Sequence, residues 1–153
     1  MDVIIRKIEE SDYPAAARLL LDELFEGKFS GDYAVPFFYE TKNNDDYVTF
    51  VAVSEDSVIG LISAITFLWA ASDRKNMIIQ GFVVKSEYRN KGIGAKLLKR
   101  MEDYADSKKM IGIGLCSGFQ RTAAHAFYEK NGHSALTKYF GKMLNPINYM
   151  REN

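Results

Sequence analysis

The sequence is poor in the residues that build metal centres and cross-links. Cys116 is its only cysteine, and it has only two histidines, His125 and His133. A single cysteine excludes an internal disulfide, so we expect a reducing, cytoplasmic setting. No group of His, Cys and Asp residues has the spacing of metal ligands, so we expect no metal. Cys116 has no partner that would mark it as a nucleophile, and we expect it in a buried strand.

Long apolar runs and a net charge are also missing. The longest nearly apolar run, Val58 to Ala71, is shorter than the roughly 20 residues that cross a bilayer as a helix. The first ten residues alternate apolar and charged side chains, unlike a secretion signal. The formal net charge is +0, and no basic tract with interleaved aromatic residues indicates nucleic acid. We therefore expect a soluble protein with no membrane and no nucleic-acid partner.

What the sequence does have is the composition of one packed domain. It has 153 residues, of which 47% are hydrophobic. A chain of this length buries roughly two-thirds of its unfolded surface, so it can fold without disulfides or a structural metal. It has no internal repeat, low-complexity tract or linker, so we expect a single domain over residues 1–153.

Charge is unevenly distributed along the chain. Residues 9–46 carry ten acids against three bases, whereas residues 85–109 carry eight bases against four acids. The first region favours cationic partners and the second favours anions, although most of these side chains are expected on solvated helix faces.

The hydrophobic pattern predicts a mixed sheet with helices on both faces, because two helical crossovers near the end require parallel strands. Gly81, inside a strand, indicates a bulge or a close backbone approach. The expected strands are residues 3–8, Tyr47–Ser54, Val58–Ala70, Met77–Val84 and Met110–Cys116, with one or two more in His133–Leu144. The expected helices begin at Ser11 or Asp12, near Val35, at Ile93 and at Gln120.

The most informative segment is the turn that joins the Met77–Val84 strand to the next helix. It has the form Arg-x-x-Gly-x-Gly, from Arg89 to Gly94. Glycines let the backbone approach a ligand, and the first helical turn presents unpaired N–H groups at the positive end of the helix dipole. Such a site binds a pyrophosphate and suits coenzyme A. The expected cofactor-binding residues here are Arg89, Asn90, Lys91, Gly92, Ile93, Gly94, Ala95 and Lys96.

Two better-known phosphate-binding motifs do not fit this turn. A Walker loop needs Gly-x-x-x-x-Gly-Lys followed by Ser or Thr, and that string is absent. A dinucleotide fingerprint needs a third glycine where this chain has Leu97. From the motif alone, a tight turn that binds no ligand remains an alternative interpretation.

Together with two further segments, the motif resembles the GCN5-related N-acetyltransferase (GNAT) family. Phe82-Val83-Val84 is similar to the family strand whose backbone binds the pantetheine arm. The segment from Ala124 to His133 is similar to the family's Ala-x-x-Phe-Tyr-x-x-x-Gly-Phe helix. The resemblance implies the acyl-CoA N-acyltransferase fold. That fold is an α/β fold with a mixed, mostly antiparallel central sheet of six to seven strands, four flanking helices and a splayed parallel strand pair.

The resemblance also implies roles for individual residues. The backbone of Phe82, Val83 and Val84 would bind the pantetheine amides and polarise the thioester carbonyl. Tyr128 would protonate the departing thiolate as general acid, and its alternative role is that of a core aromatic residue. Arg121 stands where many relatives carry an Asn that contacts pantetheine, and it is expected to contact coenzyme A through its charge.

The general base is not apparent. Where many relatives have an acid, this chain has Gln80, whose amide cannot take a proton. His125, a water chain or a distant carboxylate are the alternatives. Glu23 and Glu26 are candidates for holding a cationic acceptor, although the favoured interpretation of both is that of plain solvated acids. His133, in place of the usual Phe, is interpreted as a packing variation.

We therefore expect an acetyl-CoA-dependent N-acetyltransferase that acts by direct transfer in a ternary complex. The acceptor would be a primary amine of a small molecule, bound between residues 25–39 and the splayed strands. The alternatives are a non-catalytic coenzyme A sensor or interaction module of the same fold, and a protein or peptide N-acetyltransferase. A homodimer formed through the C-terminal strands is implied only by the resemblance.

Overall fold

The computed structural model describes residues 1–28 and 34–144, whose strands form one five-stranded sheet in the order β1-β2-β3-β4-β5. The first four strands pair antiparallel, and β4 and β5 pair parallel. The predicted mixed, mostly antiparallel sheet is thus confirmed. The bounds are β1 Ile4–Lys7, β2 Tyr47–Ser54, β3 Ser57–Leu68, β4 Lys75–Val84 and β5 Ile113–Leu115.

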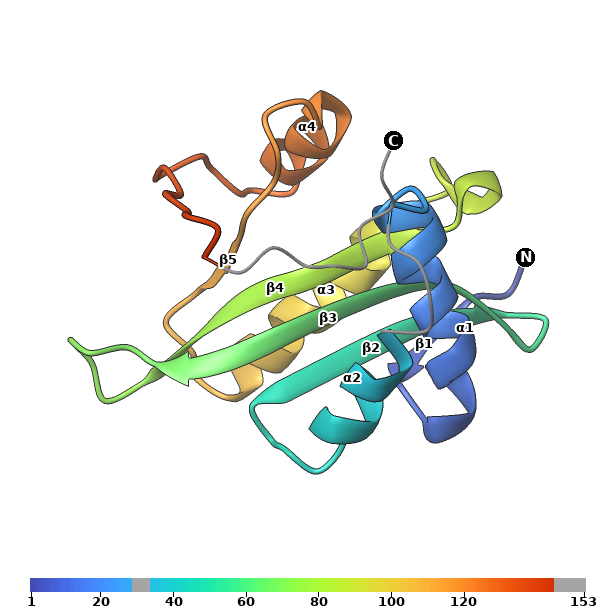
Figure 1. Cartoon of the computed structure of the whole chain (residues 1–153), viewed down its shortest axis with the longest axis horizontal. Helices are drawn as coiled ribbons and strands as arrows, with labels where there is room; N and C mark the ends of the chain where they lie inside the picture. Colours follow the sequence, from blue (N-terminus) through green and yellow to red (C-terminus); the bar gives the residue numbers. More distant parts are fainter. Residues whose placement is uncertain (29–33, 145–153) are drawn as a thin grey trace.

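Helices cover both faces of the sheet (Figure 1). The helix α1 (Tyr13–Arg18) continues as one π-helical segment, η2 (Leu19–Leu24), and packs with α2 (Ala34–Thr41) against one face. The long helix α3 (Ile93–Ser107) covers the other face. Helix α4 (Thr122–Lys130) follows β5 and lies at that end of the sheet. Short 3₁₀ turns η1 (Glu10–Asp12) and η3 (Ser86–Tyr88) precede α1 and α3.

Helix α3 is buried along the face that its sequence predicts. Ile93, Leu97, Met101 and Ala105 recur at helical spacing, and each is at most 5% exposed. They pack against inward-facing residues of β2, β3 and β4. Each large apolar side chain buried in this way contributes roughly 1.5–3 kcal/mol, so α3 is anchored firmly beneath its own N-terminal turn.

The opposite face is held by aromatic packing and one ion pair. Tyr13 stacks on Phe38 of α2 at a centroid distance of 5.3 Å. Arg6 of β1 donates to both carboxylate oxygens of Asp12, at 2.6 and 3.0 Å, and Asp12 also accepts from the Glu9 backbone N–H at 2.8 Å. These contacts fix where the first helix starts on the sheet.

Strand β4 carries a bulge at the predicted place. Ser63 pairs with Gly81 and Ala64 with Ile79, so Gln80 is the extra residue. Beyond Ile79 no described strand pairs with β4 on its β5 side, although β4 continues to Val84. The two parallel strands therefore part at the bulge, as the resemblance implied.

The C-terminal part of the sheet was predicted wrongly. The described sheet has five strands instead of six or seven, because residues 133–144 form no strand. Their apolar pattern favoured a strand, but a strand also needs a ladder partner, and none of the described residues supplies one. Leu136, Tyr139 and Phe140 are instead more than 80% exposed.

As a consequence β5 is short and lies at the edge of the described sheet. It spans three residues in place of the expected Met110–Cys116, and all three are only partly buried. Cys116 is exposed, so its expected place in a buried strand was also wrong. Within the described ranges, no helix is long and apolar enough to cross a membrane.

Candidate active site

The Arg-x-x-Gly-x-Gly turn forms a nest of backbone amides at the start of α3. Asn90 and Gly92 have positive φ values of 60° and 78°, which turn the chain sharply into the helix. Gly92 is the N-cap, no side chain caps it, and the first helical turn holds no acid. The first backbone bond here runs from the Lys96 N–H to the Gly92 carbonyl at 3.1 Å. The preceding N–H groups, which have no place in the helix ladder, are thus available to an anion.

The space in front of these amides is open. A Cβ atom placed on Gly92 would meet no atom within 4 Å, so this glycine is required for its φ and not for internal packing. At Gly94 a Cβ would lie 3.5 Å from the Phe127 ring of α4. The nest is therefore open on the Gly92 side and backed by α4 on the Gly94 side.

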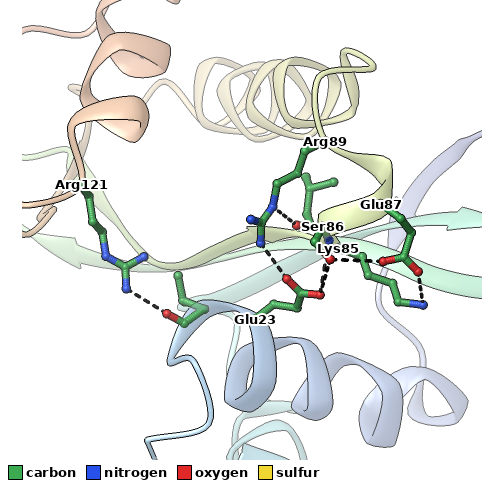
Figure 2. Close-up of polar contacts among 8 residues, drawn as sticks. Glu23, Lys85, Ser86, Glu87, Arg89 and Arg121 are labelled. Carbon is green, nitrogen blue, oxygen red and sulfur yellow. Dashed lines mark hydrogen bonds and ion pairs between the residues drawn. The ribbon is translucent and has the colours of Figure 1, made fainter.

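The cations around the nest have different environments. Lys91 donates to the Glu87 carbonyl at 3.0 Å and lies 5.3 Å from the Tyr88 ring centroid, while Lys96 is exposed. The guanidinium of Arg89 is turned away from the helix start (Figure 2). Its Nε donates to the Val84 carbonyl at 2.9 Å, and its Nη2 to Glu23 at 2.7 Å. Arg89 thus braces the turn, and its predicted phosphate contact stays a prediction.

The end of β4 leads directly to the nest. Val83 is 6% exposed and packs under the first helix, whereas Phe82 points to the other face and contacts α4. Because β5 has already diverged, the backbone edge of β4 after the bulge is free of a strand partner among the described residues. An extended ligand with amide groups can pair with such an edge.

Tyr128 of α4 lies in an aromatic group beside this edge. Its ring centroid is 6.2 Å from Phe82, 5.5 Å from Phe127 and 6.1 Å from His133. Burial raises the pKa of Tyr128 above its ordinary value, and the charge of Arg121 acts in the opposite direction. The phenol therefore holds its proton at neutral pH, as a general acid must.

Arg121 lies on the same side of the site, directly before α4. Its Nη2 donates to the carbonyl of Leu24, at the end of η2, at 2.8 Å (Figure 2). The side chain thus joins α4 to the first helical segment. The expected contact of Arg121 with coenzyme A stays a prediction.

The two acids proposed to hold a cationic acceptor differ in the partners of their carboxylates. Glu23 is hydrogen-bonded to Arg89 and Ser86, so its carboxylate is engaged with the chain between β4 and α3. This segment, residues 85–92, is called the cofactor turn below, because the cofactor is expected to bind there. Glu26 is exposed, and its Oε2 lies 3.4 Å from Nζ of Lys28. The expected acceptor region, residues 25–39, is incomplete here because residues 29–33 lie outside those described.

The remaining polar candidates offer no obvious base. Gln80 is the exposed bulge residue of β4, and its amide cannot accept a proton. His125 is half-buried on α4. His133 lies with Nε2 3.3 Å from Glu102 of α3, which adds a polar contact to its packing. Over residues 1–28 and 34–144, no group of three or more His, Cys, Asp or Glu side chains is arranged to hold a metal.

One relationship in the site has no local sequence signal. Glu23 meets Ser86 and Arg89 across separations of 63 and 66 residues. From the sequence, Glu23 could be proposed only as an acid for holding a cationic acceptor, and not as a partner of Arg89. The helical position of Glu23 and the strand end at Val84 would each have to be known before the contact could be predicted.

Comparison with solved structures gives the same fold at low sequence identity. A transcriptional regulator from Bacillus halodurans C-125 is 23% identical with a TM-score of 0.86, and the match covers 94% of this chain and 100% of that one. The aminoglycoside acetyltransferase meta-AAC0020 from an uncultured soil metagenomic sample, solved with trehalose, is 21% identical with a TM-score of 0.81 and coverage of 94% and 97%. AAC(6')-Iy, solved with the bisubstrate analog CoA-S-monomethyl-acetylneamine, is 14% identical with a TM-score of 0.81 and coverage of 95% and 100%.

Comparison with sequences adds the family. No curated protein sequence gives a significant match. The model of the Acetyltransferase (GNAT) family matches residues 13–133, which include both the amide nest before α3 and the α4 helix with Tyr128. The chain therefore belongs to the GNAT acetyltransferase family.

Proposed function

We propose that this protein is an acetyl-CoA-dependent N-acetyltransferase that moves an acetyl group to a primary amine of a small molecule. Family membership supports an N-acetyltransferase in general, and the geometry of the site supports acetyl-CoA as the donor. A small-molecule amine as acceptor is supported by the aminoglycoside acetyltransferase among the solved structures with the same fold. The observation that carries the proposal is the uncapped start of α3 at the end of the splayed strand β4. A strand edge without a strand partner and a nest of backbone amides thereby follow each other along the chain, in the order that a pantetheine arm and its diphosphate would require.

Each cofactor contact in this proposal follows from a position already described. The N–H groups of residues 92–95, which precede the first helix bond, would hold the pyrophosphate. The cations Lys91 and Lys96 would add an attraction that salt weakens. The β4 edge from Phe82 to Val84 would pair with the pantetheine amides. A backbone N–H of that edge, directed at the thioester carbonyl, would stabilise the developing oxyanion by roughly 3–4 kcal/mol.

The reaction would proceed by direct attack of the amine on the acetyl carbonyl. A tetrahedral intermediate forms and its C–S bond breaks, so that the acetyl group stays on nitrogen and the electron pair leaves on sulfur. Tyr128 supplies the proton that the thiolate takes up, since its hydroxyl is protonated at neutral pH. The amine must give up a proton in turn, and His125 or a water chain is proposed for that role in the absence of an acid at Gln80.

A thiol-release assay tests the function. Purified protein, acetyl-CoA and a panel of amines, including aminoglycosides and polyamines, should release free coenzyme A only when an accepted amine is present. Mass spectrometry should find the acetyl group on that amine. Protein that binds acetyl-CoA but releases no thiol with any amine would contradict the enzymatic assignment.

Gln80 and one structural neighbour favour a second candidate, a coenzyme A sensor or interaction module. An amide replaces the expected acid at the bulge, and the structure with a TM-score of 0.86 is that of a transcriptional regulator. Binding without turnover would favour this candidate. Acetylation of a protein N-terminus or lysine in peptide substrates would instead favour a protein acceptor.

A further inference from the structure

The end of the first helical segment is bonded to both sides of the opening between β4 and β5. Glu23 and Leu24 are consecutive residues. The Glu23 side chain accepts from the cofactor turn, and the Leu24 carbonyl accepts from Arg121 beside α4 (Figure 2). Among the described residues, no other ion pair joins the first helical segment to the cofactor turn.

Glu23 makes three contacts with the cofactor turn. It accepts from Arg89 Nη2 at 2.7 Å, from the Ser86 Oγ at 3.2 Å and from the Ser86 backbone N–H at 3.3 Å. The carboxylate side chain is 22% exposed and that of Arg89 is 49% exposed. Arg89 at the same time donates to the last residue of β4, Val84. One carboxylate thereby fixes the path of the chain from the strand end to the nest.

This arrangement has two opposite consequences for an incoming diphosphate. A partly exposed ion pair is worth only about 0–1 kcal/mol to the fold, so Glu23 is expected to contribute little to global stability. A carboxylate near the nest also opposes an anion. On the other hand, a nest that is already ordered avoids the entropy cost of ordering it during binding. The three convergent hydrogen bonds, and an Arg89 side chain that points away from the nest, favour the ordering effect.

We propose that Glu23 is a positioning residue of the cofactor site, which acts through Arg89 and Ser86 to hold the amide nest in its binding geometry. The inference rests on the proposed function, because it concerns acetyl-CoA affinity.

Isothermal titration of acetyl-CoA into four proteins tests this proposal: the unaltered chain, Glu23→Gln, Arg89→Ala and the double variant. Glu23→Gln keeps the shape of the side chain and removes its charge. It should weaken acetyl-CoA binding roughly five- to tenfold, while the melting temperature changes little. In the Arg89→Ala background the same substitution should weaken binding no more than about twofold, because its main partner is gone.

Asp22→Asn is the matched control, since Asp22 is an acid on the same helical segment. It changes the net charge equally and should leave the acetyl-CoA affinity unaltered. Tighter binding by Glu23→Gln would overturn the proposal, because it would mean that Glu23 only competes with phosphate. An unaltered affinity, or equal losses with and without Arg89, would also overturn it. If the unaltered chain binds no acetyl-CoA, the proposed function itself fails, and this inference fails with it.

Discussion

The ring of Tyr128 lies 6.2 Å from the ring of Phe82, centroid to centroid, and so joins α4 to the part of β4 that follows the bulge. Phe127 completes the contact at 5.7 Å from Phe82. The strand proposed to hold the pantetheine arm and the residue proposed to protonate the thiolate are therefore packed against each other. This contact gives the first prediction.

Tyr128→Phe should lower kcat about 100-fold and leave the acetyl-CoA affinity within about twofold, because only the proton donor is removed while the ring keeps its packing. Steady-state kinetics and calorimetry measure the two effects separately. Tyr104→Phe is the matched control, since Tyr104 packs on Phe50 away from the splayed strands. Equal kcat values for Tyr128→Phe and the unaltered enzyme would make Tyr128 a packing residue only.

Gly92→Asp should abolish acetyl-CoA binding. The carboxylate would occupy the open space in front of the α3 amides and satisfy the N–H groups that the pyrophosphate needs. Gly92→Ala is the control for backbone strain. With φ at 78° both variants should lose about 1–2 kcal/mol of unfolding free energy, but the alanine variant should still bind. Measurable binding by a folded Gly92→Asp protein would argue against a site at this helix start.

Gly81→Ala should lower the free energy of unfolding by about 1–2 kcal/mol, because its Cβ would lie 2.9 Å from Cδ2 of Leu20. Urea denaturation measures the loss. In a Leu20→Ala background, where the obstructing atoms are absent, the additional cost of Gly81→Ala should fall below about 0.5 kcal/mol. Strictly additive losses would mean that the bulge and η2 do not pack as described.

Asp12 should make the stability depend on pH. Burial acts to raise the pKa of Asp12, but the hydrogen bonds from Arg6 and the Glu9 N–H outweigh it and hold the pKa below its ordinary value. The stabilisation is therefore complete above the unfolded pKa of about 3.9 and is lost as pH falls through the lower folded value. Asp12→Asn should cost about 2 kcal/mol at pH 7, and that difference should shrink toward zero in strong acid. Urea unfolding across this range, with exposed Asp2→Asn as control, measures it, and a difference independent of pH would contradict the assignment.

Local patterns explain which parts of the fold could be predicted. The apolar stripe of α3 and the interior glycine of β4 are visible within a few residues, and the structure confirms both. The segment after α4 could not be predicted in this way. Its apolar residues are those of a strand, but whether they form one depends on a partner elsewhere in the chain.

In the candidate site, too, local features could be predicted from the sequence and long-range contacts could not. The amide nest is contained in six consecutive residues, and the motif accounts for the positive φ of Gly92 and for the helix that starts there. The orientation of Arg89 does not, because it depends on Glu23, which lies 66 residues away. A single sequence therefore locates the nest but does not reveal how the cations around it are turned.

Backbone amide shifts in ¹⁵N-labelled protein, followed by NMR during titration with coenzyme A, test the central claim most directly. The amides of residues 92–95 should show the largest changes, because hydrogen bonds to a pyrophosphate deshield them, and the amides of Phe82 to Val84 should follow. Saturable binding that leaves residues 92–95 unperturbed would contradict the account, since the diphosphate would then lie elsewhere.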